Sequence, residues 1–311
     1  MIEVESLIKQ YGPVTVVDGV SMSVARGCIA VIVGTSGSGK STLLRMINRL
    51  VEPTSGRVLI DGRDTAATPA HLLRRQIGYV IQGHGLFPHR TVAENIATVP
   101  RLLGWDAVRI AARVAELLTV FQLEPGEYAA KFPHELSGGQ QQRVGVARAL
   151  AAGPAVLLMD EPFGALDPII RGKAQDDLRD IQRRFGTTVV LVTHDMDEAF
   201  RLGDRVGVMS QGRMLQYDRP AALLRSPADP FVQRLTGTSE RALRLLSLTT
   251  AAEAAEPGPA EGPAVPASAS LREVLAELLW RGAATATVLK ADGTPGGHLT
   301  LAAILARGRP G

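Results

Sequence analysis

Short apolar runs alternate with stretches of helical periodicity from Met1 to about Val232, which is the pattern of a layered α/β domain. Buried strands are predicted where a run is short, mostly apolar and bounded by glycine, proline or polar residues. These runs are Ile29–Val33, Tyr79–Ile81, Val156–Met159 and Thr188–Thr193. The apolar positions of Ile110–Phe121 recur at helical spacing and predict a helix with one buried stripe. Val206–Met209 and Met214–Tyr217, joined through Gln211-Gly212, predict a hairpin.

The chain changes character after about Leu248. Residues 249–266 are rich in alanine, proline, glycine and glutamate and offer almost nothing to bury. This composition predicts a linker, so residues 236–269 are expected to form a helix followed by an extended connection.

A small folded unit is predicted beyond this linker, over residues 270–311. Ser270 and Glu273 are spaced as a capping box, and an apolar helix face follows them. The strands Thr285–Leu289 and His298–Leu301 and a short final helix complete a unit of about forty residues. A unit of that size rarely folds alone, so we expect it to pack against another surface, such as a second copy of itself.

Length and composition narrow the class of protein. The 311 residues suffice for about two domains. Lysine and arginine together number 34 against 31 acidic residues, and this small excess gives no reason to expect a nucleic-acid partner. A single cysteine, Cys28, excludes an intrachain disulfide and fits a reducing compartment. We expect neither a secretory signal nor a membrane span, so any attachment to a membrane would pass through another polypeptide.

The strongest local motif follows the first buried strand. It matches G-x-x-x-x-G-K-[ST] and runs into the helical stretch Thr42–Leu50. Its glycines let backbone N–H groups point at phosphate oxygens, Lys40 can reach the β- and γ-phosphates, and Ser41 can ligate Mg²⁺. A plain Gly/Ser turn would need no strand, lysine and helix in these places. The predicted phosphate-binding residues are Gly34, Thr35, Ser36, Gly37, Ser38, Gly39, Lys40, Ser41 and Thr42.

A pair of acidic residues, Asp160 and Glu161, ends the apolar strand Val156–Met159. Open α/β sheets bind ligands at the carboxyl ends of their strands. There Asp160 would hold Mg²⁺, usually through water, and Glu161 would polarise the attacking water as a general base. A helix-start cap is the commoner reason for such a pair, but beside a phosphate loop the catalytic interpretation is favoured.

Further motifs appear in a fixed order along the chain, each of them weak when taken alone. Ser137 and the amides of Gly138 and Gly139 precede the apolar helix Val144–Leu150 and predict a second anion site at a helix start. The other motifs are Tyr11, Gln82 after Tyr79-Val-Ile, Leu136-Ser-Gly-Gly-Gln140, Ala165-Leu-Asp167, and His194 after Val190-Leu-Val-Thr. Through these motifs the chain resembles the ATP-binding subunit of ABC transporters over residues 1 to about 235.

The resemblance implies a fold and a partner. It implies a P-loop NTPase with a RecA-like core, an N-terminal antiparallel β region and a helical insertion at about residues 83–145, which contacts membrane subunits. In this family two ATP-binding domains pair head to tail, and each ATP lies between the phosphate loop of one and the signature of the other. The chain carries one of each, so we expect a homodimer that binds ATP and Mg²⁺.

Residue roles follow from the same resemblance. Tyr11 would stack on adenine, His194 would contact the γ-phosphate, and Gln82 would touch the water or Mg²⁺. The opposite subunit would supply Ser137, Gly138, Gly139 and Gln140, and would be contacted by Asp167. The implied catalytic residues are Glu161, His194 and Gln82, and the implied metal ligands are Ser41, Gln82 and Asp160.

Several segments narrow the resemblance to importers of quaternary amines and osmoprotectants such as glycine betaine, choline or proline betaine. They are Met46–Leu50, Ile77–Gln82, Gly85–His89, Val99–Trp105 and Phe163–Arg171. The chain would then energise import from the cytoplasmic face of the inner membrane, through separate permease subunits. Only 4% of residues are aromatic, and no aromatic cage for a cation can be identified, so a separate binding protein would hold the substrate.

The C-terminal unit resembles half of the tandem CBS modules that this subfamily often carries. It departs from that pattern in being single and in its long predicted linker, which makes regulation through it doubtful.

Other readings remain open at this point. An importer of a different substrate, or a soluble ABC ATPase acting on nucleic acid or ribosomes, would carry the same motifs. The second of these would be expected to show long coiled coils, two joined ATPase domains or a basic stripe, none of which the sequence has. A P-loop kinase would leave the Ser137-Gly-Gly segment unexplained.

Overall fold

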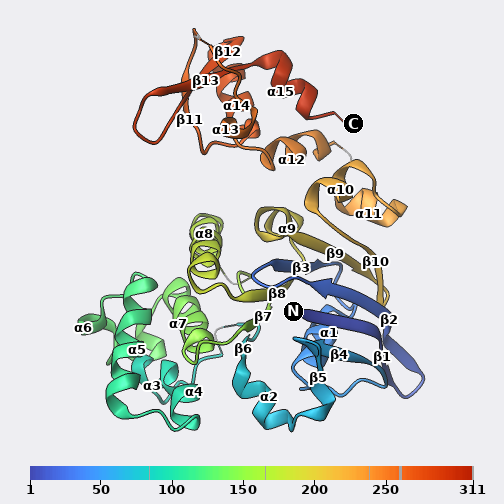
Figure 1. The fold of residues 1–311 in the computed structure, drawn as a ribbon, viewed down its shortest axis with the longest axis vertical. Coiled ribbons are helices and arrows are strands. Elements are labelled where there is room, and N and C mark those ends of the chain that lie inside the picture. Colours follow the sequence, from blue (N-terminus) through green and yellow to red (C-terminus); the bar gives the residue numbers. More distant parts are fainter. Residues whose placement is uncertain (84, 165, 238, 259–260, 310–311) are drawn as a thin grey trace. The chain divides into compact units, whose positions relative to one another are not determined.

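The computed structural model describes residues 1–83, 85–164, 166–237, 239–258 and 261–309. The chain divides into two compact units, Met1–Tyr217 and Asp218–Gly311 (Figure 1). The division falls earlier than the expected domain end at residue 235, because α10 (Pro220–Arg225) packs with α12 (Arg241–Ser247) inside the second unit. Among the described residues, no helix combines the length and hydropathy needed to cross a bilayer.

The central sheet of the first unit has six strands in the order β10-β9-β3-β8-β7-β6. Its neighbours β9 and β3, β3 and β8, β8 and β7, and β7 and β6 run parallel, and every residue of β3, β7 and β8 is buried. This confirms the predicted parallel core, although β6 begins two residues earlier than expected and leaves Ile81 outside, 41% exposed. The bounds are β3 Ile29–Val33, β6 Ile77–Val80, β7 Val156–Asp160, β8 Thr188–Thr193, β9 Arg205–Ser210 and β10 Arg213–Asp218.

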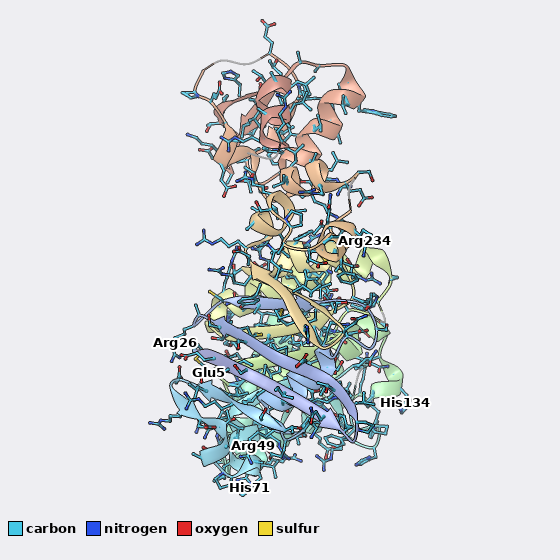
Figure 2. The ribbon with its side chains drawn as sticks, turned by 90° about the vertical axis from the view of Figure 1, so that its right-hand side faces the viewer. Glu5, Arg26, Arg49, His71, His134 and Arg234 are labelled. Atoms are coloured by element: carbon cyan, nitrogen blue, oxygen red, sulfur yellow. The ribbon has the colours of Figure 1, made fainter. Side chains whose placement is uncertain are left out.

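A second sheet in the same unit is antiparallel, with the order β2-β1-β4-β5. It is the N-terminal β region that the resemblance implied. On its exposed side Arg57 pairs with Glu5 at 2.6 Å and Arg26 with Asp61 at 2.6 Å, near the blue strands of Figure 2; exposed pairs of this kind stabilise a fold little. The bounds are β1 Ile2–Tyr11, β2 Val14–Val24, β4 Ser55–Ile60 and β5 Arg63–Asp64, followed by the 3₁₀ turn η1 Thr65–Ala67.

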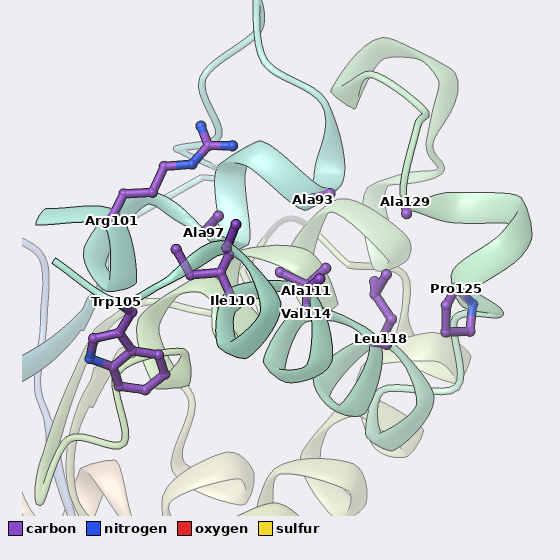
Figure 3. A pocket seen from close by; sticks show the side chains of 12 residues that line it. Ala93, Ala97, Arg101, Trp105, Ile110, Ala111, Val114, Leu118, Pro125 and Ala129 are labelled. Carbon is purple, nitrogen blue, oxygen red and sulfur yellow. The ribbon is translucent and has the colours of Figure 1, made fainter. Parts of the chain in front are cut away.

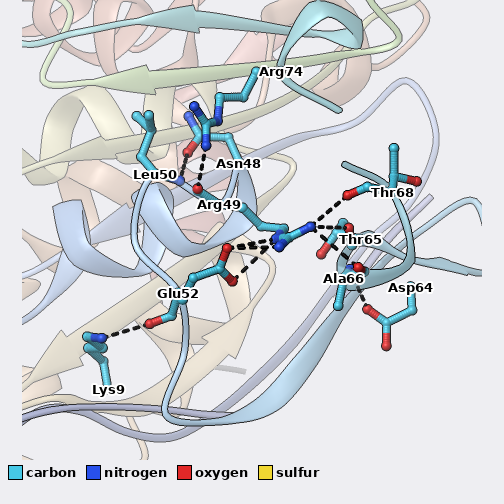
Figure 4. A network of polar contacts seen from close by, with 10 residues as sticks. All are labelled: Lys9, Asn48, Arg49, Leu50, Glu52, Asp64, Thr65, Ala66, Thr68 and Arg74. Carbon is cyan, nitrogen blue, oxygen red and sulfur yellow. Dashed lines mark hydrogen bonds and ion pairs between the residues drawn. The ribbon is translucent and has the colours of Figure 1, made fainter. Parts of the chain in front are cut away.

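Helix α1 (Lys40–Ile47) joins the two sheets into one hydrophobic core. Its buried Leu44 and Ile47 belong to the same cluster as Ile2 and Leu7 of the antiparallel sheet and Ile32 of the central sheet. The helix ends at Ile47, and a network of polar contacts holds residues 48–52 that follow it (Figure 4).

Arg49 is the centre of that network. It adopts a positive φ of 53°, and its guanidinium donates to the carbonyl oxygens of Thr65 and Thr68 at 3.0 and 2.7 Å and pairs with Glu52 at 2.9 Å. These contacts fix the end of α1, and with it the direction in which the helix leaves the phosphate motif.

A cluster of helices forms the predicted insertion, drawn in green in Figure 1. Helix α5 buries Val114, Leu117 and Leu118, as the apolar spacing predicted. A groove of about 540 Å³ opens beside α5, between residues such as Ala97, Trp105 and Pro125 (Figure 3). Within the insertion the bounds are α3 Val92–Ile96, α4 Thr98–Leu102, α5 Ala107–Val120, α6 Pro125–Tyr128 and η2 Pro133–Glu135, followed by α7 Gly138–Leu150. The other helices of this unit are α2 Ala70–Gln76, α8 Pro168–Phe185 and α9 Met196–Leu202.

The second unit has a three-stranded sheet, β11-β12-β13, and its own core. Strand β11 runs parallel to β12, and β12 runs antiparallel to β13. The predicted capping box is confirmed, because Ser270 and Glu273 exchange hydrogen bonds at the start of α14. The remaining bounds are α11 Pro230–Leu235, α13 Ala251–Ala254, β11 Ala264–Pro266, α14 Leu271–Arg281, β12 Thr285–Leu289, β13 Pro295–Thr300 and α15 Leu301–Arg307.

The expectation of a linker over residues 249–266 is wrong at the two ends of that segment, whereas residues 256–258 and 261–262 between them are exposed. Ala251, Ala254 and Val265 are 0%, 8% and 5% exposed and belong to the core of the second unit, and residues 264–266 form β11. Small side chains lowered the apparent hydrophobicity of the segment, yet they fit closely against α14. The helix–strand–strand–helix unit therefore finds its packing surface in its own chain, and its likeness to a CBS module stays a prediction.

Candidate functional site

Four strands of the central sheet deliver the predicted site residues to one edge. Because β6, β7, β8 and β3 are parallel neighbours, their carboxyl ends meet on the same side of the sheet. Gln82 follows β6, Glu161 follows β7, His194 follows β8 and the phosphate loop follows β3. The topology thus assembles residues that are far apart in the sequence.

Glycine is required at two positions of the phosphate loop for different reasons. A Cβ on Gly34 would lie 2.1 Å from the carbonyl oxygen of Met209, which leaves no room for one. Gly39 has φ of 96° and would place a Cβ 2.4 Å from the carbonyl oxygen of Val16. At both positions the loop therefore lies directly against neighbouring backbone, which only glycine allows, and glycines also permit the backbone bends that phosphate-binding loops need.

The turn between β9 and β10 supports the loop from outside. Gln211 and Gly212 both have positive φ, 48° and 81°. The Gly212 amide donates to the carbonyl of Ser38 at 3.2 Å, and its carbonyl accepts from the Asp18 amide at 2.9 Å. The turn therefore ties the phosphate loop to strand β2.

Lys40 lies under the loop and is only 5% exposed. Its ammonium donates to the carbonyl oxygens of Gly34 and Thr35 at 2.7 and 2.9 Å. Burial lowers the pKa of Lys40, while the carboxylates of Glu161 and Asp160 act in the opposite direction. A positive charge is thereby held within the loop that would surround the phosphates.

Ser41 and Asp160 form the pair expected of a metal site. The Ser41 hydroxyl donates to Asp160 Oδ1 at 2.8 Å, and Asp160 is 1% exposed. The second oxygen, Oδ2, has no hydrogen-bond partner among the described residues and lies 3.6 Å from the guanidinium of Arg45. A hydroxyl beside a buried, unsatisfied carboxylate oxygen fits Mg²⁺, which takes oxygen ligands and keeps several waters.

Arg45 is a member of this site that the sequence reasoning missed. It lies four residues after Ser41 on α1, and residues at this spacing share one face of a helix. This spacing from Ser41 is the sequence feature that points to Arg45 as a neighbour of the metal site. Its charge offsets part of the negative charge on the buried Asp160.

Glu161 is the point at which the catalytic candidates converge. Its Oε2 lies 3.4 Å from Gln82 Nε2 and 3.4 Å from His194 Nδ1. The residue has a positive φ of 45°, and its amide donates to the Val192 carbonyl at 2.9 Å. The backbone after β7 is therefore bent away from the strand direction, in a conformation that only surrounding contacts can hold. Such an arrangement can accept a proton from a water placed between the carboxylate and a phosphate.

The signature segment is built as a helix start. Ser137 Oγ accepts from the Gln140 amide, and Gln140 Oε1 accepts from the Ser137 amide at 2.9 Å, which is a capping box. The Gln140 side chain also donates to the Tyr128 hydroxyl at 3.0 Å. Gly138 and Gly139 occupy the first two positions of α7, where amides lack partners within the helix and can bind an anion.

Two further predicted residues lie at exposed positions. Tyr11 ends β1, is 51% exposed and has the Lys9 ammonium 4.8 Å from its ring centroid. Asp167 is exposed just before α8, and Ala165 of the same motif lies outside the described residues. Within the described part of the chain, no hydrogen bond or ion pair joins Tyr11 or the Ser137–Gln140 segment to the phosphate loop. These residues are presented at the surface rather than gathered at one site.

Glu198, on the first turn of α9 behind His194, is a buried acid that sequence reasoning did not single out. It is 4% exposed. Burial and the nearby Asp195 raise its pKa to about 8, although Arg171 and hydrogen bonds with Thr193 and Gln175 favour the charged form. At neutral pH the folded protein therefore holds a proton here that the unfolded chain releases.

The pH dependence of stability should report this proton. Between the ordinary pKa of 4.5 and about 8 the folded state binds more protons, so stability falls as pH rises. The slope due to this group is at most about 1.4 kcal/mol per pH unit. We expect Glu198→Gln to raise the melting temperature, and the gain to grow between pH 5 and pH 8 in calorimetry. A gain that is equal at both pH values would contradict the buried, protonated carboxyl.

Comparison with known proteins identifies one family. Residues 17–164 match the family described as ABC transporter. The chain is 47% identical over 300 residues to the glycine betaine uptake system ATP-binding protein YehX of Escherichia coli K12, covering 96% of this chain and 97% of that protein. It is 49% identical over 264 residues to the osmoprotectant import ATP-binding protein OsmV of Salmonella typhimurium LT2, covering 83% and 69%.

A solved structure of similar fold is the dimeric, post-hydrolysis state of the ATP-binding cassette MJ0796 bound to ADP and Pi. It superposes with a TM-score of 0.63 at 34% identity and covers 70% of this chain and 98% of that chain.

Proposed function

Because this chain belongs to the ATP-binding subunits of ABC transporters, we propose that it hydrolyses ATP to drive uptake of glycine betaine or a related osmoprotectant through separate membrane permease subunits. The observation that carries the hydrolytic part is the meeting of Gln82 and His194 on one oxygen of Glu161, beside the phosphate loop. The 47% identity with a glycine betaine uptake protein along nearly its whole length supports the choice of substrate.

Binding of ATP would begin at the phosphate loop. The inward amides and the Lys40 ammonium would surround the β- and γ-phosphates, and Tyr11 would stack on the adenine. Ser41 and Asp160 would hold Mg²⁺, with Gln82 near it; the metal supplies charge neutralisation on the phosphate oxygens. The contact of Arg45 with Asp160 Oδ2 would hold that carboxylate with its Oδ1 directed toward Ser41.

Hydrolysis would then depend on three side chains of this chain. Glu161 accepts a proton from the attacking water, Gln82 orients that water, and His194 donates a hydrogen bond to the γ-phosphate as negative charge develops on it. The water oxygen would bond to the γ-phosphorus as the bond between this phosphorus and the bridging oxygen breaks, which releases ADP and inorganic phosphate.

A second copy of the chain would complete each site. The phosphate loop and the signature segment lie on separate elements of one chain, and the amides of Gly138 and Gly139 offer a second phosphate-binding surface. A head-to-tail homodimer would place this surface over the ATP of its partner, and the similar cassette bound to ADP and Pi is dimeric. Asp167 would face the partner in the same arrangement.

The substrate would be recognised elsewhere. We expect a separate substrate-binding protein to hold the quaternary amine, and Mg-ATP to act at the cytoplasmic face of the inner membrane, where the chain attaches through its permease. Nucleic acid is not an expected partner, since the charges nearly balance.

Uptake in cells tests the transport assignment. Deletion of the gene for this chain should abolish the uptake of radiolabelled glycine betaine that is stimulated by high osmolarity. The wild-type chain should restore uptake and Glu161→Gln should not, although both are made in equal amounts. Choline, carnitine and proline betaine added as competitors would define the substrate range. Unchanged uptake of glycine betaine, and of choline, carnitine and proline betaine each radiolabelled in turn, by the deletion strain would exclude this substrate class while leaving the ATPase assignment intact.

A further inference from the structure

Arg171, near the start of α8, contacts two segments on either side of the catalytic residues. Its Nη2 donates to the carbonyl of Leu166 at 2.9 Å, and its Nη1 lies 3.5 Å from Asp195 Oδ2. Its own amide donates to the Asp167 carbonyl at 2.9 Å. One guanidinium therefore joins the segment Leu166–Asp167 to the loop that carries His194.

Asp195 is well placed to receive this contact. Its Oδ1 accepts from the amides of Asp197 and Glu198 at 2.8 and 3.1 Å and caps α9, which leaves Oδ2 for Arg171. Asp195 also follows His194 directly in the chain. Because the two residues are adjacent, a displacement of Asp195 would be passed through the backbone to His194, whose imidazole lies 3.4 Å from Glu161.

A second ion pair between the same two helices provides a comparison. Arg201 of α9 contacts Asp176 of α8 at 2.7 Å, and both side chains are largely exposed. This pair links α8 and α9 through Asp176 and Arg201, two residues that lie outside both the segment Leu166–Asp167 and the loop that carries His194. Variants of the two pairs can therefore distinguish a role in packing α8 against α9 from a role at the catalytic site.

We propose that Arg171 is a positioning residue that couples the segment Leu166–Asp167 to His194, so that the seating of one subunit against its partner sets the hydrolytic competence of its own site. The idea rests on the proposed function, because it needs the dimer in which Asp167 faces the partner. When the segment moves on dimer contact, Arg171 carries the displacement through Asp195 to the imidazole. Arg171 would act through Asp195 and His194 rather than by contact with the nucleotide or the attacking water.

The test measures ATP hydrolysis by the full-length chain over a range of ATP concentrations. Arg171→Ala should lower kcat by about tenfold, because small misplacement of a catalytic group is costly in rate. It should also reduce the Hill coefficient for ATP toward 1, with the affinity for a fluorescent ATP analogue and the melting temperature unchanged. The control, Arg201→Ala, should leave kcat and the Hill coefficient within twofold of wild type.

Asp195→Asn approaches the same link from the other side, and it keeps an oxygen for the helix cap. It should lower kcat and the Hill coefficient as Arg171→Ala does, and the double variant should be no slower than either single one. Additive losses, or equal behaviour of Arg171→Ala and Arg201→Ala, would overturn the coupling. Glu161→Gln tests the proposed function separately from the coupling through Arg171. If this variant hydrolysed ATP at the wild-type rate, the proposed function itself would fail.

Discussion

Glu161→Gln should bind ATP and fail to hydrolyse it. The amide has the same shape as the carboxylate, and its oxygen can still accept from Gln82 and His194, which lie 3.4 Å from Glu161 Oε2. It cannot accept a proton from water, and loss of a positioned general base lowers rates by about 10²–10⁴-fold. Phosphate release measured in a coupled assay should fall by that factor, while ATP affinity stays within a few-fold of wild type.

The same variant should accumulate as an ATP-bound dimer. If each ATP lies between two chains, a site that cannot hydrolyse keeps the chains together, and size-exclusion chromatography with Mg-ATP should show twice the monomer mass. Glu116→Gln is a matched control, since this carboxylate is 44% exposed and pairs with Arg113 in the insertion. Wild-type phosphate release by Glu161→Gln would falsify the assignment of Glu161 as the base.

Lys40→Ala should lose ATP binding itself. The ammonium is buried and donates to the carbonyls of Gly34 and Thr35, so the variant loses both a phosphate ligand and an internal support of the loop. A hydrogen bond to a charged group is worth about 1.5–3 kcal/mol, and each 1.4 kcal/mol is a tenfold change in affinity. We expect the dissociation constant for ATP, measured by calorimetry, to rise at least about a hundredfold.

A surface lysine serves as the control for lost charge. Lys131 pairs with Glu127 at 2.6 Å on the helical insertion, away from the strand ends that carry the site. Lys131→Ala should bind ATP as the wild type does. Comparable losses in both variants would mean that general electrostatics, rather than the loop, governs affinity.

The phosphate site could be predicted from sequence because its determinants are local. The chain from Gly34 to Ser41 carries its glycines, lysine and hydroxyl within one turn, directly after a buried strand. The parallel core was equally visible, since strands buried on both faces are apolar at nearly every position. Their shared orientation is also what brings Gln82, Glu161 and His194 to one edge.

The rest depended on packing that no single segment encodes. The approach of Arg45 to Asp160 and the positive φ of Glu161 arise only when α1, β7 and β8 are assembled. In the second unit, the composition predicts a linker around Ala251 and Val265, yet both are buried, because alanine-rich composition does not distinguish an exposed chain from small side chains in a tight core. Removing residues 249–311 would therefore cut through that core, and a test of regulation by the second unit should remove residues 218–311 instead.

The turn at Gln211-Gly212 has a practical consequence for protein engineering. A two-residue hairpin loop that joins surface strands is ordinarily a convenient place for an epitope tag or a fluorescent insertion. Here the amide and the carbonyl of Gly212 are both committed, to Ser38 and to Asp18. An inserted peptide would disturb the contact between Gly212 and Ser38 of the phosphate loop. We therefore expect the tagged protein to bind ATP more weakly than the untagged one.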